Sequence, residues 1–169
     1  DVAASTINKG GRIVVYLGDE LDGLSLFPVR ILGPENDSHQ NVGHAMAGGD
    51  FNGDGADELV VGQYDYKNGN TKNAGAIYIF AGGDLPNEPS TFVGHLVGAE
   101  WMASHTGAYD RLGASLAIGD LNGDGFPDLV AGTYSDEVPG GESDTGTVNY
   151  YMGTEGGFPQ LEPARMVPG

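Results

Sequence analysis

The chain has 169 residues, of which 30 are glycine, 9 are proline and 18% are charged. This length is enough for a domain with a real core, and the many turn-forming residues, without any long helical period, favour an all-β fold. The net charge of −17, with seven lysines and arginines, excludes a surface that tracks nucleic-acid phosphates, and no apolar run is long enough for membrane insertion.

Two short apolar segments near the start of the chain predict two β-strands. Residues 11–18 place the β-branched Ile13 two positions after a glycine and the aromatic Tyr16 five positions after it. Residues 27–33 begin with phenylalanine and end with glycine. Short apolar runs bounded by turn formers are typical of buried strands, so both segments are interpreted as strands of one incomplete sheet.

Both segments recur later in the chain, which indicates an internal repeat. The first recurs at residues 75–82 and 146–153, again with a β-branched and an aromatic residue at the same positions. The second recurs at residues 92–98, and in degenerate form at 161–167.

Two loops rich in aspartate and asparagine precede these recurrences. Oxygen-bearing side chains stand at every second position, a glycine follows, and an acidic residue comes four positions after the third oxygen; the residues are Asp50, Asn52, Asp54 and Glu58, then Asp120, Asn122, Asp124 and Asp128. Anionic groups this close repel one another unless a cation lies between them. All-oxygen ligands favour a hard cation, Ca²⁺ before Mg²⁺, and predict two calcium sites.

Two other interpretations of these loops were weighed. An EF-hand needs a glutamate at the twelfth loop position and flanking helices, but those positions hold Val61 and Ala131 inside apolar, strand-like runs. An ordinary polar turn would explain one such cluster, whereas two copies with the same spacing and flanks favour a metal-binding hairpin.

One repeat unit is predicted to contain four short strands, near residues 43–49, 58–64, 75–81 and 91–97, with the calcium loop between the first two. Four antiparallel strands per repeat predict β-propeller blades, because such a sheet buries both faces only when neighbours stack on it. The chain then divides into a partial blade with its last two strands (1–40) and two full blades (41–110 and 111–169). These are about two and a half blades, and a propeller needs about four to eight to close.

The units resemble FG-GAP repeats, the blades of integrin α-subunit propellers. The resemblance lies in Val42-Gly43 and Leu112-Gly113, in the aspartate-rich loops, and in the strand ends at residues 61–64 and 131–134. It implies that the first, third, fifth and ninth side chains and the seventh carbonyl of each loop bind calcium. In this chain those positions are Asp50, Asn52, Asp54, Ala56 and Glu58, then Asp120, Asn122, Asp124, Phe126 and Asp128. Asp57 is an alternative to Glu58.

The incomplete propeller predicts partners. The remaining blades are expected from a larger parent chain, from another subunit or from self-association, because an open stack would expose apolar faces. Loops 65–74 and 134–145 differ most between the repeats, so binding specificity is expected there, with solvated turns as the alternative. The four histidines show no metal-ligand spacing and are interpreted as surface or structural residues, and Trp101 is expected in the connection between blades.

These features predict a non-enzymatic, calcium-binding FG-GAP propeller segment for recognition of, or adhesion to, a protein or glycan ligand. Calcium sites suit an extracellular, cell-surface or periplasmic location. The alternatives are a non-catalytic module of a secreted enzyme and a structural subunit that polymerises through blade edges. No nucleophile-elbow pattern supports a hydrolase.

Overall fold

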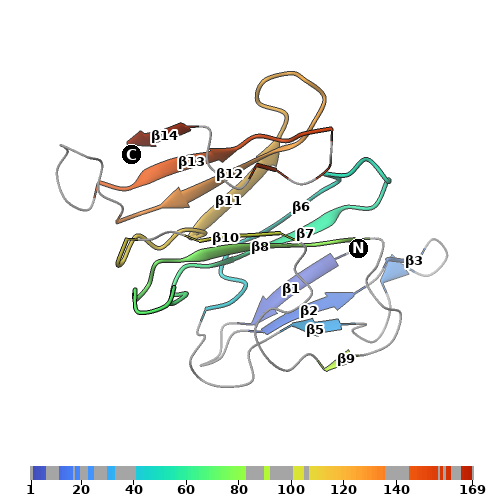
Figure 1. The fold of residues 1–169 in the computed structure, drawn as a ribbon. Coiled ribbons are helices and arrows are strands. Elements are labelled where there is room, and N and C mark those ends of the chain that lie inside the picture. Colours follow the sequence, from blue (N-terminus) through green and yellow to red (C-terminus); the bar gives the residue numbers. More distant parts are fainter. Residues whose placement is uncertain are drawn as a thin grey trace.

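The computed structural model describes residues 2–6, 12–16, 18–19, 23–24, 30–32, 41–82, 90–91, 101–104, 107–135, 145–155, 157, 159–160 and 165–168. These residues form β-strands and turns, and none of them is helical. Three four-stranded sheets lie one above another, with the second sheet in the middle (Figure 1). The predicted all-β class is therefore confirmed.

The second and third sheets are antiparallel and share one topology. Their strands are, in chain order, β6 (Met46–Gly49), β7 (Glu58–Gln63), β8 (Ala76–Phe80) and β10 (Trp101–Ser104), then β11 (Ser115–Gly119), β12 (Asp128–Thr133), β13 (Thr147–Tyr151) and β14 (Arg165–Pro168). The registers match as well, since Leu59 pairs with Phe80 where Leu129 pairs with Tyr151. Each unit is thus a blade of four strands, as the repeats predicted.

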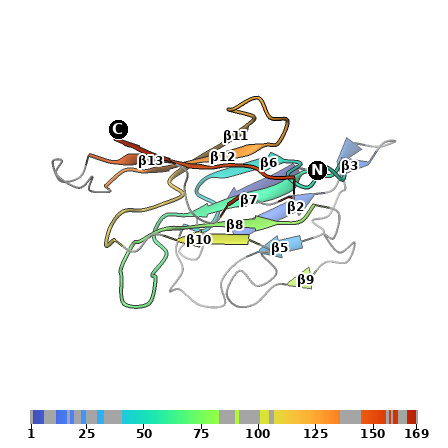
Figure 2. The same ribbon diagram turned by 45° about the horizontal axis from the view of Figure 1, so that its top comes forward.

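The first sheet contains more than the two strands expected from residues 10–33. It comprises β1 (Val2–Thr6), β2 (Arg12–Tyr16), β5 (Arg30–Leu32) and β9 (Ser90–Thr91), of which β9 joins β5 in parallel. Val2 of β1 pairs with Tyr16 of β2, just as Leu59 of β7 pairs with Phe80 of β8. Strand β1 therefore corresponds to β7, the second strand of a blade. A small hairpin of β3 (Gly18–Asp19) and β4 (Gly23–Leu24) lies at the periphery in both Figure 1 and Figure 2.

The fourth strand of the second sheet lies later in the chain than predicted. Residues 92–97, part of the predicted strand, lie outside the described residues, and Ser90–Thr91 joins the first sheet instead. The edge of β8 is paired by β10, in which Trp101 lies opposite Ile79. Trp101 is therefore in a strand and not in a connection. Backbone pairing at a sheet edge needs no particular side chain, which explains why the motif similarity did not locate it.

The core lies in two clusters, one on each face of the second sheet. Successive residues of a strand point to opposite faces, so Val60 and Ile77 face the third sheet while Val61 and Tyr78 face the first. The cluster toward the third sheet is formed by Phe51, Val60, Ile77, Ile79, Ala103, Leu112, Leu129, Ala131 and Tyr151. The cluster toward the first sheet is formed by Ile13, Val15, Val42, Val61, Ala76, Tyr78 and Phe80. Stacking thus buries both faces of the middle blade.

Backbone of the second and third blades comes into direct contact at two glycines. A Cβ atom at Gly62 would overlap the carbonyl oxygen of Gly113, and Gly113 itself has a φ of +83°. Gly62 is also held from its own blade, because its N–H donates to Ala45 O (2.9 Å) and its carbonyl accepts from Gly43 N–H (3.0 Å). The Gly62 backbone cannot withdraw without losing these bonds.

We expect Gly62→Ala to lower the free energy of unfolding by about 1–3 kcal/mol, the usual cost of overpacking. Gly119→Ala is the matched control, because a Cβ there meets nothing within 4 Å. Chemical denaturation of the two variants checks the prediction. Equal stability of both variants would show that the backbones at Gly62 and Gly113 can move apart without a loss of stability.

Candidate metal-binding loops

The two aspartate-rich loops have the same backbone conformation. One joins β6 to β7 and the other joins β11 to β12. Gly53 and Gly55 have φ angles of 76° and 89°, and Gly123 and Gly125 have 77° and 90°. A Cβ at any of the four would meet nothing within 4 Å, so glycine is needed here for its left-handed conformation and not for space.

The first aspartate of each loop is bound by the loop's own amides. The N–H groups of Gly53 and Asp54 donate to Asp50 Oδ1 (2.7 and 3.2 Å), and Gly55 N–H donates to Asp50 Oδ2 (2.9 Å). Asp120 receives the same three bonds in the second loop, at 2.7, 3.1 and 2.9 Å. Three amides therefore hold each of these carboxylates in place.

The third and fifth residues continue the pattern. Asn52 Oδ1 accepts from Asp54 N–H (2.8 Å) and Asp54 Oδ1 accepts from Ala56 N–H (2.8 Å). The equivalent bonds to Asn122 Oδ1 and Asp124 Oδ1 are 2.8 and 2.9 Å long. The alternation seen in the sequence thus produces a repeated series of side-chain oxygens turned back onto the loop.

The ninth residue of each loop is completely buried and joins the loop to its blade. Glu58 Oε2 accepts from Phe51 N–H (2.8 Å), and Glu58 Oε1 accepts from Gly82 N–H (3.3 Å). Asp128 Oδ2 accepts from Leu121 N–H and its Oδ1 from Gly153 N–H, both at 2.8 Å. Glu58 therefore takes the structural place of Asp128, while the side chain of neighbouring Asp57 is exposed.

Sequence reasoning missed two glycines that this arrangement requires. Gly82 and Gly153 donate to the ninth carboxylates, and a Cβ on either would overlap the carbonyl oxygen of Asp57 or Pro127. Both end the recurring strand motifs at 75–82 and 146–153. That repeated final glycine was the signal, since it marks where a loop approaches the end of the third strand too closely for a side chain.

The donor chemistry of the loops fits a hard divalent cation. Every candidate side-chain ligand offers oxygen, the preference of Ca²⁺ and Mg²⁺. Within the part of the chain that the structure describes, no three His, Cys, Asp or Glu side chains are grouped closely enough to hold a metal. The oxygens are instead directed to loop amides, so binding a cation would require some of them to turn inward.

Aromatic side chains gather near the opposite end of the strands. His44 meets Tyr64 edge to face (ring centroids 4.7 Å apart), Tyr64 lies 6.5 Å from Tyr134, and the Arg111 guanidinium is 4.5 Å above the Tyr134 ring. Burial raises the pKa of the Tyr64 hydroxyl, and the nearby Asp65 adds to the effect. His44 is therefore part of an aromatic cluster; the other three histidines lie outside the described residues.

Comparison with known proteins agrees with this geometry. The FG-GAP repeat family model matches residues 42–80 and 112–148, which span the two loops and the strands beside them. Within the described residues, no helix is both long and apolar enough to cross a membrane.

Several relatives align with most of the chain. Integrin alpha-5 of Xenopus laevis is 30% identical over 132 residues, covering 75% of this chain and 11% of the relative. Integrin alpha-3 of Mus musculus is 30% identical, covering 75% and 11%, and the mouse phosphatidylinositol-glycan-specific phospholipase D is 32% identical, covering 70% and 14%.

The chain belongs to the FG-GAP repeat family of integrin α-like β-propellers. Its sheets are propeller blades, too few to close a ring. It spans about one seventh or less of the length of these relatives.

Replacing a buried ninth carboxylate is expected to destabilise the blade even without metal. Glu58→Ala leaves the Phe51 and Gly82 amides without their acceptor, at a cost of about 1–3 kcal/mol for each buried donor. Asp57→Ala removes the exposed neighbour and should change the unfolding free energy by less than about 0.5 kcal/mol. Urea denaturation in the presence of a chelator measures both changes in unfolding free energy. A larger loss for Asp57→Ala than for Glu58→Ala would assign the structural role of the ninth residue to Asp57.

Proposed function

We propose that this chain is a non-enzymatic, calcium-binding propeller segment that recognises a protein or glycan outside the cell as part of a larger propeller or assembly. The observation that carries the proposal is the pair of loops with matching hydrogen bonds, both at one end of the strands (Figure 1). Segments 65–75 and 107–113 lie at the other end in Figure 1 and Figure 2, which leaves them available for binding.

Each loop would hold one Ca²⁺ through four side chains and one carbonyl. The ligands would be Asp50, Asn52, Asp54, the Ala56 carbonyl and Glu58 in the first loop, and Asp120, Asn122, Asp124, the Phe126 carbonyl and Asp128 in the second. A bound Ca²⁺ supplies positive charge between carboxylates that otherwise repel. Because the ninth residue also bonds to the end of the third strand, the ion would fasten the first three strands together.

The binding face is proposed at the end away from these loops. Tyr109 and Tyr134 are 48% and 51% exposed there, and the Arg111 guanidinium lies against the Tyr134 ring. Tyrosine and arginine are among the residue types that dominate many recognition surfaces. Because calcium sites suit calcium-rich extracellular surroundings, we place this recognition outside the cell.

The outer face of the third blade supports a larger assembly. Leu121 is 53% exposed, whereas Phe51 at the same loop position is 2% exposed because the third blade covers it. Val148 and Tyr150 are half-buried, while their counterparts Ile77 and Ile79 are fully buried. A further blade on this face, from the parent chain, another subunit or a copy of this chain, would complete the burial.

A second candidate is a non-catalytic module of a secreted enzyme. The similarity to phosphatidylinositol-glycan-specific phospholipase D favours it, although the aligned region is 14% of that protein. This candidate leaves the calcium loops and the binding face unchanged and differs in what the module is attached to. Self-polymerisation through blade edges is the remaining alternative.

Calcium should raise the unfolding free energy of the wild-type chain, and it should raise that of the Asp124→Ala variant by a smaller amount. A ligand at about 100 times its dissociation constant adds about 2.7 kcal/mol for one site, and the variant would lose one of two such contributions. The Asp124 side chain is exposed, so in chelator the variant should match the wild type within about 0.5 kcal/mol.

The measurement is a pair of thermal melts in calcium and in EGTA, with Asp57→Ala as a control that removes an exposed carboxylate from the first loop outside the proposed ligand set. An equal loss for Asp124→Ala in both buffers would mean that the loop is an ordinary turn. The same result would remove the calcium part of the proposed function.

A further inference from the structure

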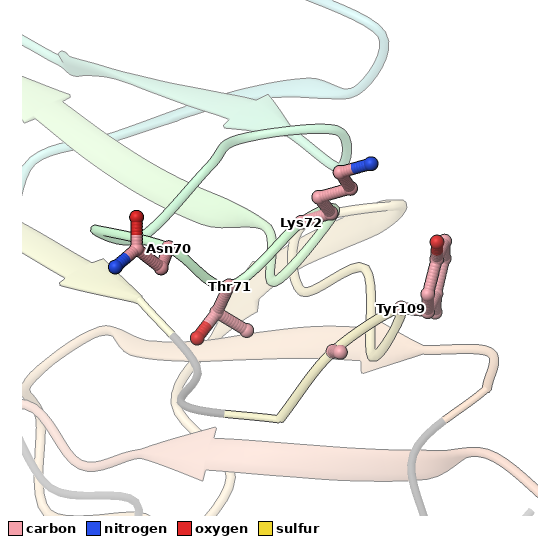
Figure 3. Close-up of a pocket in the computed structure, with 5 residues that line it drawn as sticks. Asn70, Thr71, Lys72 and Tyr109 are labelled. Carbon is pink, nitrogen blue, oxygen red and sulfur yellow. The ribbon is translucent and has the colours of Figure 1, made fainter.

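A hollow of about 410 Å³ lies between two loops at the proposed binding face. Its lining is formed by Asn70, Thr71, Lys72, Ala108 and Tyr109. Figure 3 shows Lys72 and Tyr109 on one side of this region and Asn70 and Thr71 on the other. The lining therefore combines an amide, a hydroxyl, an ammonium group and an aromatic ring around a space of ligand size.

The first wall is a tight turn held from both directions. Asn68 N–H donates to Thr71 O (3.0 Å) and Thr71 N–H donates back to Asn68 O (2.9 Å), with Gly69 between them at a φ of 60°. Asn68 Nδ2 also donates to Ser104 Oγ (3.2 Å), which ties the turn to β10. Asn70 and Thr71 are thus presented by a fixed backbone.

The second wall presents Tyr109 in an unusual backbone conformation. Its φ is 71°, in the left-handed region that bulky residues rarely adopt, and the residue is 48% exposed. Tyr109 N–H donates to Lys72 O (3.0 Å), and two further bonds, Arg111 N–H to Asn73 O (3.0 Å) and Leu112 N–H to Ala74 O (3.1 Å), continue the contact. A strained residue held this firmly with its ring facing solvent suggests selection for a ligand and not for packing.

We propose that this hollow binds a short glycan through a sugar that carries a carboxylate. The assignment rests on the proposed function, of which it specifies the ligand. The Tyr109 ring offers a flat apolar surface for the C–H face of a sugar, and the Asn70 amide and Thr71 hydroxyl can exchange hydrogen bonds with sugar hydroxyls. Lys72 supplies the opposite charge for a carboxylate.

Other ligand classes fit this lining less well. Ala108 is the only aliphatic residue among the described residues that line the hollow, so a peptide anchored by a large apolar side chain would find no pocket. A highly charged polyanion would be repelled by a chain with a net charge of −17. A sugar with a single carboxylate, placed next to the Lys72 ammonium, avoids most of that repulsion.

The test is titration of the full chain, in calcium, with 3′-sialyllactose and digalacturonate as acidic probes and lactose as the neutral probe, followed by calorimetry. We expect at least one acidic probe to bind at least about ten-fold more tightly than lactose, a difference of about 1.4 kcal/mol. Failure of both acidic probes to bind, or equal binding of lactose, would overturn the assignment.

Three variants locate the site. Tyr109→Asn removes the ring but keeps a residue that tolerates positive φ, so the fold should survive and binding should fall at least ten-fold. Lys72→Met should abolish the preference for the acidic probe, whereas Lys67→Met, an exposed lysine outside the hollow, should retain it. Unchanged binding by Tyr109→Asn with an unchanged melting temperature would contradict the proposal.

Thermal melts of the same samples in calcium and EGTA separate this inference from the proposed function. Calcium-dependent stability without binding of either acidic probe would refute the glycan site and leave the calcium-binding segment intact. Binding of an acidic probe that Tyr109→Asn weakens, without calcium-dependent stability, would support the glycan site and refute the calcium loops.

Discussion

The buried carboxylate at the ninth position of each loop is the interaction on which the rest of the structure depends. Glu58 and Asp128 accept hydrogen bonds both from the start of their own loop and from the glycine that follows the third strand. A carboxyl group this deeply buried is tolerated only when its oxygens are hydrogen-bonded. Each therefore fixes the loop against the strands, whether or not a cation is added.

This constraint gives the two ends of the stack different properties. At the loop end, carboxylates and amides are concentrated and glycines adopt the backbone conformations that side chains resist. At the other end, segments from neighbouring blades contact one another through backbone bonds, as between Leu112 and Ala74. Rigid blades with a held loop at one end can present different side chains at the other without losing their fold.

The sequence predicted the repeated parts of the molecule well and the irregular parts less well. The strands at 58–63 and 76–80 were recognisable because apolar runs ended at glycines and recurred with their pattern intact. The strand at Trp101–Ser104 and the pairing of Val2–Thr6 with β2 were missed because edge pairing depends on the backbone and not on a side-chain pattern. The closeness of Tyr109 to Lys72 likewise follows from how the segment between β10 and β11 packs on the second blade, which no local motif encodes. The metal ligands remain a prediction from the loop spacing.

The most direct test of the calcium-loop proposal is a count of the metal ions bound by the folded chain. Native mass spectrometry after equilibration in calcium should show the mass of the chain plus two Ca²⁺ ions, and EGTA should remove both. A contradicting result would be a chain that has a folded charge-state distribution after equilibration in calcium but shows no added metal mass. The aspartate-rich loops would then not be calcium sites.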